Sequence, residues 1–198
     1  MSFYSFASVV CRAFIKLAFQ LKIEGEENIP KDGGFIVCSN HRSFADPIML
    51  ALPLKNNVIF MAKAELFRNR FFAWILRKLG AFPVERGKGD MSAVNYAIDS
   101  VKNGKVLVLF PEGTRSRTGE LLRLRSGAVV VASQTQGTIV PVGIQFAGKL
   151  HFRSKVTVRY GEPLPAAALG LDTMDKRSLR GAKELLREKL LKLLEERT

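Results

Sequence analysis

The sequence predicts an α/β fold: a single domain with a central, mostly parallel or mixed sheet flanked by helices. A length of 198 residues corresponds to about one domain. Short apolar runs alternate with helical patterns along the chain, which is the order typical of a sheet with helices on its faces. No repeat, low-complexity tract or linker divides the chain. The composition, 47% hydrophobic and 25% charged, excludes a disordered or fibrous protein.

The elements follow from these runs. The candidate strands are Gly34–Ser39, Val58–Ala62, Ala81–Val84, Val106–Phe110, Ile139–Ile144 and Lys155–Tyr160. Helical patterns lie between several of them, at Pro47–Leu52, Asn69–Leu79, Met91–Lys102 and Gly127–Gln134. Asn103-Gly104 is a common signal for the end of a helix. A final amphipathic helix is expected at 178–197, with leucines on one side and interleaved charges on the other.

The first 22 residues predict an amphipathic helix at a membrane interface. On a helix, one narrow polar stripe is formed by Ser5, Ser8, Arg12, Lys16 and Gln20, and aromatic and apolar residues cover the other side. The uncharged run ends at Cys11 and is too short to span a bilayer, which needs about 20 residues. The helix could instead pack on the domain's own core, or do both. We expect residues 1–22 to form this helix and residues 23–198 the main domain.

The charge narrows the class of partner. There are 31 basic and 18 acidic residues, and the resulting net charge of +13 favours nucleic acid, an acidic membrane surface or a phosphorylated small molecule. Residues 63–88 hold seven basic and two acidic residues among bulky aromatic side chains, which suits an anionic bilayer. No recognition helix or base-stacking sheet face is evident, so we expect no nucleic-acid partner. Two cysteines, Cys11 and Cys38, exclude a disulfide framework, a zinc finger or an iron–sulfur site.

The first chemical motif, Asn40-His41-Arg42-Ser43-Phe44-Ala45-Asp46-Pro47, directly follows an apolar strand. Open α/β sheets usually place ligands at the carboxyl ends of their strands. A carboxylate bound to one imidazole nitrogen fixes the tautomer and leaves the other nitrogen as a general base. His41 and Asp46, five residues apart across a turn, are therefore a candidate base and its orienting carboxylate. Alternatively, Asp46 caps the following helix and His41 is an ordinary loop residue.

Three side chains near His41 are candidate nucleophiles. Cys38 lies in the apolar strand, where a buried thiol is inert. Ser39 and Ser43 are close in sequence, but a hydrogen bond to the backbone or to Asp46 explains Ser43 more simply. Direct attack by a substrate hydroxyl needs none of these side chains.

The second motif, Phe110-Pro111-Glu112-Gly113-Thr114-Arg115-Ser116, also follows an apolar strand. Gly113 permits a positive φ and a close approach of backbone to ligand. Thr114 and Ser116 supply hydroxyls, and the planar guanidinium of Arg115 suits a phosphate. The motif therefore indicates a phosphate-binding loop, and a hairpin turn with a solvated arginine is an equal alternative.

Together, NHRSFAD and FPEGTRS resemble the glycerolipid acyltransferase family, and within it the short bacterial 1-acyl-sn-glycerol-3-phosphate (lysophosphatidic acid) acyltransferases. Gly80–Arg86 is similar to the family's second block and Val140–Val142 to its fourth. Met61–Phe67 is similar to a lysine-bearing segment of the bacterial enzymes. Larger family members carry a longer amino-terminal anchor, so stable membrane attachment is expected to need additional surface.

The resemblance implies an O-acyltransferase of phospholipid synthesis. His41 would act as general base, oriented by Asp46, while the sn-2 hydroxyl of lysophosphatidic acid attacks an acyl thioester of coenzyme A or acyl carrier protein. The acceptor phosphate would meet Lys63, Arg86 and Arg115, with Glu112, Gly113 and Thr114 shaping the same pocket. No metal or cofactor is expected beyond the thioester co-substrate. The expected location is the cytoplasmic face of the cell membrane, as a monotopic or peripheral protein.

Other interpretations stay open. A relative could acylate glycerol 3-phosphate, another lysophospholipid or an ornithine-type lipid. A basic, non-enzymatic membrane or nucleic-acid binding protein would keep its binding without His41 and Asp46. Lys63 could be a solvated residue at a helix start, and Arg86 could belong to a basic surface run.

Overall fold

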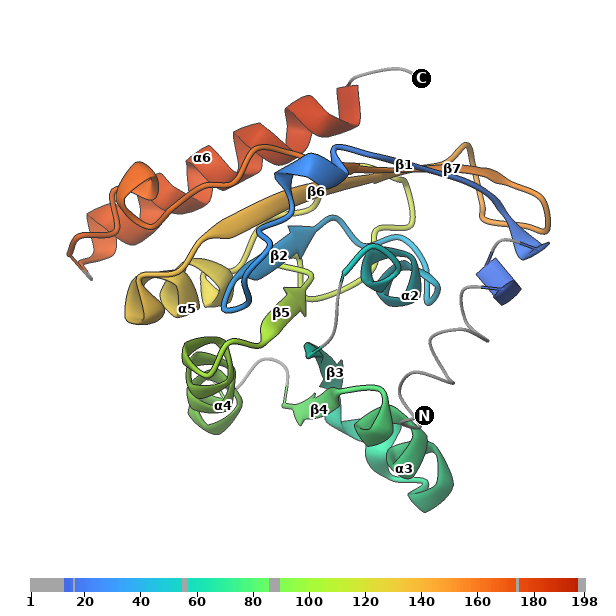
Figure 1. The fold of residues 1–198 in the computed structure, drawn as a ribbon, viewed down its shortest axis with the longest axis horizontal. Coiled ribbons are helices and arrows are strands. Elements are labelled where there is room, and N and C mark those ends of the chain that lie inside the picture. Colours follow the sequence, from blue (N-terminus) through green and yellow to red (C-terminus); the bar gives the residue numbers. More distant parts are fainter. Residues whose placement is uncertain (1–12, 16, 55–56, 86–89, 174, 196–198) are drawn as a thin grey trace.

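The computed structural model describes residues 13–15, 17–54, 57–85, 90–173 and 175–195. Its centre is a seven-stranded sheet in the order β1-β7-β6-β2-β5-β3-β4 (Figure 1). The strands are β1 (Gln20–Glu24), β2 (Ile36–Ser39), β3 (Val58–Lys63), β4 (Ala81–Val84), β5 (Val106–Leu109), β6 (Ile139–Gln145) and β7 (Lys155–Tyr160). The strands β6, β2, β5, β3 and β4 are parallel to one another, whereas β7 is antiparallel to β6, and β1 is parallel to β7. The predicted mostly parallel, mixed sheet is confirmed.

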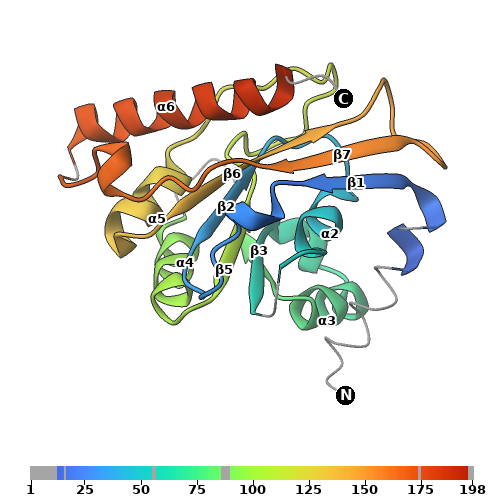
Figure 2. The same ribbon diagram turned by 45° about the horizontal axis from the view of Figure 1, so that its top comes forward.

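Helices cover both faces of the sheet. They are α2 (Asp46–Ala51), α3 (Arg70–Lys78), α4 (Met91–Lys102), α5 (Gly127–Thr135) and α6 (Lys176–Glu195), with short 3-10 turns η1 (Glu26–Asn28), η2 (Ala64–Phe67) and η3 (Ala167–Leu169). In Figures 1 and 2, α4, α5 and α6 lie together along one side of the sheet, and α2 lies on the other. The larger core packs residues of α4, α5 and α6 against one face of the strands. The second core includes Met49 and Leu50 of α2, together with Ile15.

The apolar sequences of the central strands are explained by burial on both faces of the sheet. All four residues of β5, Val-Leu-Val-Leu, are buried, and Leu107 belongs to one core while Val108 belongs to the other. Continuous apolar runs of this kind are typical of parallel strands covered on both sides. The predicted helix stop is also confirmed, because α4 ends at Lys102 and Gly104 has φ 78°. In α6 the buried residues Ala182, Leu186, Leu190 and Leu193 form the predicted apolar side.

The amino-terminal prediction needs one correction. The expected helix ran to residue 22, but Gln20–Glu24 form strand β1, so the domain boundary at 22 falls inside the sheet. Leu21 and Ile23 pack on the second core and alternate with polar neighbours, a period-two pattern that indicates a strand. A wider helical pattern over residues 1–20 obscured it. Most of the polar stripe lies outside the described residues.

The described part of the amino-terminal segment, residues 13–15 and 17–18, is helical. Ile15 is fully buried, whereas Phe14 and Leu17 are 61% and 68% exposed. The segment therefore packs on the core with one side and leaves apolar side chains exposed on the other. Among the described helices, none has the length and apolar character required to cross a bilayer.

The topology brings the two motifs together. Parallel strands end at the same edge of a sheet, and β2 and β5 are neighbours with Cys38 opposite Leu109. The loop after β2 carries the first motif, and the loop after β5 carries the second. The next strand, β3, ends at Lys63, opposite Val84 at the end of β4. This carboxyl edge is the place where ligands bind in open α/β sheets.

Candidate active site

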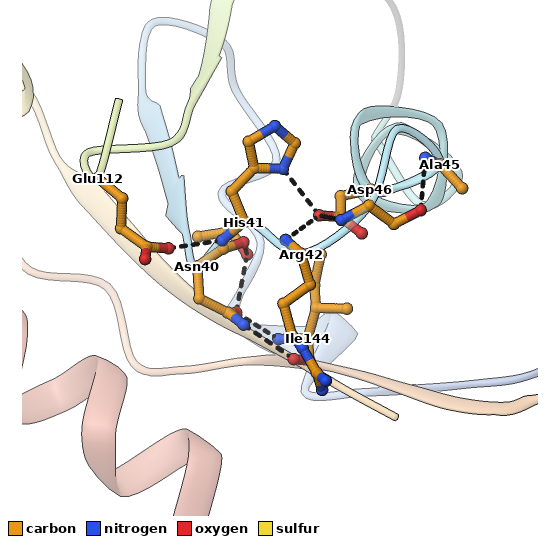
Figure 3. A network of polar contacts seen from close by, with 9 residues as sticks. Asn40, His41, Arg42, Ala45, Asp46, Glu112 and Ile144 are labelled. Carbon is orange, nitrogen blue, oxygen red and sulfur yellow. Dashed lines mark hydrogen bonds and ion pairs between the residues drawn. The ribbon is translucent and has the colours of Figure 1, made fainter. Parts of the chain in front are cut away.

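His41 and Asp46 form the predicted pair. The Nδ1 atom of His41 lies 2.8 Å from Oδ2 of Asp46, and the His41 side chain is 12% exposed while that of Asp46 is fully buried. Figure 3 shows the second imidazole nitrogen pointing away from Asp46. Because an ionised carboxylate only accepts hydrogen bonds, this contact places a proton on Nδ1 and leaves a lone pair on Nε2. That is the arrangement of a general base with its orienting carboxylate.

Asp46 also holds the loop that carries His41. Its Oδ2 accepts hydrogen bonds from the backbone N–H groups of Arg42 and Ser43, each at 2.7 Å. The alternative in which Asp46 caps the following helix is wrong, because α2 begins at Asp46 itself and Ala45 occupies the cap position without a side-chain cap bond. The carboxylate turns back towards the preceding loop. It thereby fixes both the backbone of the motif and the imidazole orientation.

The second motif holds His41 from the other side. The imidazole stacks on the ring of Phe110, with centroids 3.9 Å apart and planes 16° from parallel. The backbone N–H of Ser116 donates to the carbonyl oxygen of His41 at 2.7 Å. The ring of His41 is therefore restrained by Asp46 at one edge and by Phe110 across its face. This contact of Phe110 was not predicted from the sequence. Phe110 directly follows the strand beside β2, and that position indicates that it lies close to His41.

Glu112 anchors backbone N–H groups on either side of the site. It is 4% exposed, and its carboxylate accepts the backbone N–H of His41 at 2.7 Å (Figure 3) and that of Leu122 at 2.8 Å. Burial raises the pKa of Glu112 above its ordinary value, although the two backbone hydrogen bonds act in the opposite direction. Both carboxylate oxygens are engaged by the protein, so this geometry argues against direct contact with a phosphate. Its hydrogen bond holds the backbone at His41.

The tip of the second motif lies at the surface. Gly113 has φ 71°, as its place in the motif predicted, and a Cβ there would come within 2.7 Å of the Arg125 guanidinium. Thr114 and Arg115 are exposed. The guanidinium of Arg115 lies over the ring of Phe44, 3.6 Å from its centre. Phe44 belongs to the first motif, so this stacking brings Arg115 over the loop that carries His41.

The remaining basic candidates lie further along the same edge. Lys63 ends β3 and is exposed, with its Nζ 2.8 Å from the Glu65 carboxylate. Arg86 follows β4 but lies outside the described residues. The structure therefore brings His41, Asp46, Glu112 and Arg115 together, and it places Lys63 two strands away from His41 on the same edge.

Two polar residues of the first motif have structural roles. The side chain of Asn40 donates to the carbonyl of Ile144 at 2.9 Å and accepts from its N–H at 2.7 Å, which ties the end of β2 to β6 (Figure 3). Arg42 donates to the carbonyls of Phe146 and Gly148 and stacks on the Phe146 ring at 4.0 Å. Both side chains brace the loop from the β6 side.

The candidate nucleophiles are otherwise occupied. The Ser43 hydroxyl accepts the Ala45 N–H at 3.1 Å, and the Ser39 hydroxyl donates to the Asn40 carbonyl at 3.1 Å. Cys38 is fully buried, and this burial raises the pKa of its thiol. None of these contacts directs the side chain to His41. Within the described residues there is also no group of three or more metal-ligating side chains.

A histidine–aspartate pair at the carboxyl edge of a mixed sheet is an arrangement suited to general-base chemistry. The family model described as "Acyltransferase" matches residues 20–145, and the chain belongs to that family. It is an O-acyltransferase.

Known relatives agree with this assignment. The 1-acyl-sn-glycerol-3-phosphate acyltransferase of Bacillus subtilis is 34% identical over 168 residues, which are 83% of each chain. The lyso-ornithine lipid O-acyltransferase of Pseudomonas aeruginosa is 32% identical over 141 residues, 69% of this chain and 52% of that protein. The crystal structure of the 1-acyl-sn-glycerophosphate (LPA) acyltransferase PlsC from Thermotoga maritima matches with a TM-score of 0.74 and 28% identity, covering 98% of this chain and 83% of the other.

Proposed function

We propose that this protein transfers an acyl group from an acyl thioester to the sn-2 hydroxyl of lysophosphatidic acid and so makes phosphatidic acid. The observation that carries the proposal is the His41–Asp46 hydrogen bond of 2.8 Å at the carboxyl edge of the sheet. The activity for which the Bacillus subtilis relative is named supports this acceptor.

In the proposed step, Nε2 of His41 accepts the proton of the acceptor hydroxyl as its oxygen attacks the thioester carbonyl carbon. The new C–O bond forms, the C–S bond breaks, and the imidazolium gives its proton to the departing thiolate. Asp46 stabilises the imidazolium, and the stacked ring of Phe110 keeps the imidazole in one orientation. No acyl-enzyme forms, which agrees with the occupied hydroxyls of Ser39 and Ser43.

We assign Arg115 and Lys63 to the acceptor phosphate, with Arg86 as a third cation. Arg115 presents a planar, always charged fork beside the His41 loop. Gly113 and Thr114 form the loop that presents it. In this proposal Glu112 is a positioning residue, which revises its expected place among the phosphate-binding residues. We propose no metal and no cofactor beyond the thioester, whether coenzyme A or acyl carrier protein.

We also propose that the protein works at the cytoplasmic face of an anionic membrane, as a peripheral or monotopic enzyme. The exposed apolar residues Phe14 and Leu17 in the amino-terminal segment support this, and so does the net charge of +13.

The test is acyl transfer from radiolabelled acyl-CoA or acyl carrier protein to lysophosphatidic acid in mixed micelles. We expect turnover that falls by a factor on the order of 10² to 10⁴ in His41→Ala and in Asp46→Asn, with folding checked by circular dichroism. His151→Ala is the matched control, because His151 is outside the site. Full activity of a folded His41→Ala protein would refute the mechanism.

A second acceptor class has one observation in its favour, the similarity to the lyso-ornithine lipid O-acyltransferase. Glycerol 3-phosphate and lyso-ornithine lipid, supplied in parallel assays, decide between acceptors. Turnover confined to the ornithine lipid would replace lysophosphatidic acid as the substrate and leave the roles of His41 and Asp46 intact.

A further inference from the structure

Helix α3 and the preceding turn η2 expose several large apolar side chains in one place. Phe71, Phe72 and Trp74 are 66%, 58% and 49% exposed, and Leu66 of η2 is 46% exposed. Apolar side chains gathered at the surface in this way mark a contact site for a membrane, a ligand or a protein.

The helix is oriented so that these rings face away from the sheet. Ala73 is the buried residue of α3, so its side faces the domain. At about 100° per residue, Phe71 lies roughly opposite Ala73, with Trp74 and Phe72 on either side of it. The aromatic side chains therefore form the outer surface of α3.

A cationic groove runs beside this aromatic surface. It has a volume of about 700 Å³ and is lined by Phe67, Arg70, Ala73, Trp74, Arg77 and Lys78. Among these described lining residues there are three cations and no carboxylate. The guanidinium of Arg77 lies 5.7 Å from the centre of the Phe67 ring. Cations between aromatic walls are chemically suited to a lipid phosphate at the boundary between headgroups and acyl chains.

The position of α3 relates this surface to the active site. The helix connects β3 to β4 and so follows the strand that ends at Lys63. Figures 1 and 2 place α3, α2 and the helical segment that precedes β1 on the same side of the molecule, away from α4 and α5. Phe14 and Leu17 of that segment are exposed as well. Apolar and cationic groups from separate parts of the chain thus lie on the side that carries α2, whose first residue is Asp46.

We propose that η2 and α3 form a docking surface for an anionic phospholipid bilayer. Phe71, Phe72 and Trp74 enter the interface, and Arg70, Arg77 and Lys78 bind a lipid phosphate in the groove. This occupant is favoured by charge complementarity between an anionic leaflet and the three groove cations, whose described lining contains no carboxylate. The proposal rests on the proposed function and deepens it, because it names the surface that brings the site to its lipid acceptor.

Trp74 is the only tryptophan in the sequence, so intrinsic fluorescence reports on this surface directly. The full-length protein is titrated with vesicles of phosphatidylcholine containing phosphatidylglycerol, with pure phosphatidylcholine vesicles, and with inorganic phosphate. We expect a blue shift of Trp74 emission and quenching by brominated lipid acyl chains with the anionic vesicles. We expect a much weaker response to neutral vesicles and none to inorganic phosphate.

Variants distinguish binding through the α3 surface from attraction by the net charge of the whole protein. Arg70→Gln/Arg77→Gln/Lys78→Gln is expected to weaken vesicle affinity on the order of 100-fold, since each cation near an anionic leaflet contributes about fivefold. The matched control, Lys176→Gln/Arg177→Gln/Lys192→Gln on α6, removes the same charge from exposed positions on another helix and is expected to have a much smaller effect. Phe71→Ser/Phe72→Ser should also weaken binding, whereas Met91→Ser, at an exposed position on α4, should not.

Three results would overturn the proposal. These are vesicle binding with unchanged Trp74 emission, equal loss of affinity in the α6 control, and absence of vesicle binding altogether. A fluorescence response to inorganic phosphate as large as that to vesicles would assign the groove to a free anion instead. None of these readouts requires turnover. An inactive protein would therefore refute the proposed function and leave the proposed docking surface unaffected. Conversely, turnover of a short-chain, water-soluble acceptor by the α3 triple variant would show that failed docking leaves the chemistry intact.

Discussion

At the residue scale, the restraints on His41 come from two separate parts of the chain, its own motif and the second motif. Asp46 binds Nδ1, Phe110 covers the ring face, and the backbone N–H and C=O of His41 bond to Glu112 and Ser116. A base held in this way loses little orientational freedom when the acceptor binds. The orientation of His41 therefore depends on several residues besides Asp46.

Glu112→Gln tests one such restraint. The amide of Gln has one acceptor oxygen, so one of the two partly buried N–H groups now bonded by Glu112 loses its partner, at a cost of about 1–3 kcal/mol. We expect kcat to fall on the order of tenfold to a hundredfold through misplacement of His41, with KM for the acceptor little changed. Glu162→Gln, at an exposed position, is the control. A rise in KM alone would return Glu112 to the phosphate site.

The raised pKa of Glu112 also predicts a pH dependence. Its ordinary value is 4.5, and the folded protein releases this proton at higher pH than the unfolded chain. The folded state therefore binds more protons in this window, and stability falls as the pH rises from about 4 through the folded pKa. Urea unfolding across this window should show the stability gap between wild type and Glu112→Gln narrowing with rising pH, and constant above it. A gap that widens would contradict burial as the cause.

Phe44 is expected to orient Arg115 for the acceptor phosphate. An exposed cation–π contact contributes about 0.5–1 kcal/mol, so Phe44→Ala should raise KM for lysophosphatidic acid about two- to fivefold with kcat unchanged. Phe44→Tyr should restore the wild-type value, and Phe152→Ala, at another exposed position, should not change it. An unchanged KM in Phe44→Ala, or a lowered kcat, would separate the ring from phosphate binding. Steady-state kinetics with a short-chain acceptor measures both.

At the scale of elements, the site is held by contacts between strand ends. Asn40 ties β2 to β6 through two hydrogen bonds to Ile144, which is fully buried. Asn40→Ala leaves two buried backbone groups without partners, at about 1–3 kcal/mol each. We expect a matching loss in the free energy of unfolding in urea, whereas Asn103→Ala, whose side chain bonds at an exposed helix end, should cost much less. Equal losses in the two variants would argue against this role of Asn40.

Comparison of individual strands shows which parts of the fold could be predicted from the sequence. The runs at β5 and β6 are buried on both faces, and their local patterns were sufficient. Strand β1 was missed because its alternation is short and continues a helical pattern of apolar residues. Its strand conformation comes from pairing with β7, more than one hundred residues away in sequence, with Gln20 opposite Lys155.

At the scale of the whole molecule, the net charge of +13 predicts salt-dependent membrane binding. The Debye length falls from about 30 Å at 0.01 M to about 3 Å at 1 M salt, so affinity for anionic vesicles should fall steeply with added salt. Vesicle co-sedimentation over a salt series measures this, and neutral vesicles provide the control. Affinity independent of salt would assign the association to apolar contacts alone.

The sequence by itself determined the fold class, the pair His41 and Asp46, and the two loops at strand ends, because these depend on local periodicity and on short motifs. Only the tertiary structure decided the roles of Glu112, Phe110 and Asn40. In a sequence, a buried glutamate that accepts backbone N–H groups cannot be distinguished from a glutamate that lies beside a phosphate. The role of Glu112 depends on its contact with the loop that follows the neighbouring strand. That loop is distant along the chain, so no local sequence pattern indicates the contact. The exposed aromatic surface of α3 was also decided by the tertiary structure, because the packing of the helix on the sheet determines which aromatic side chains are exposed.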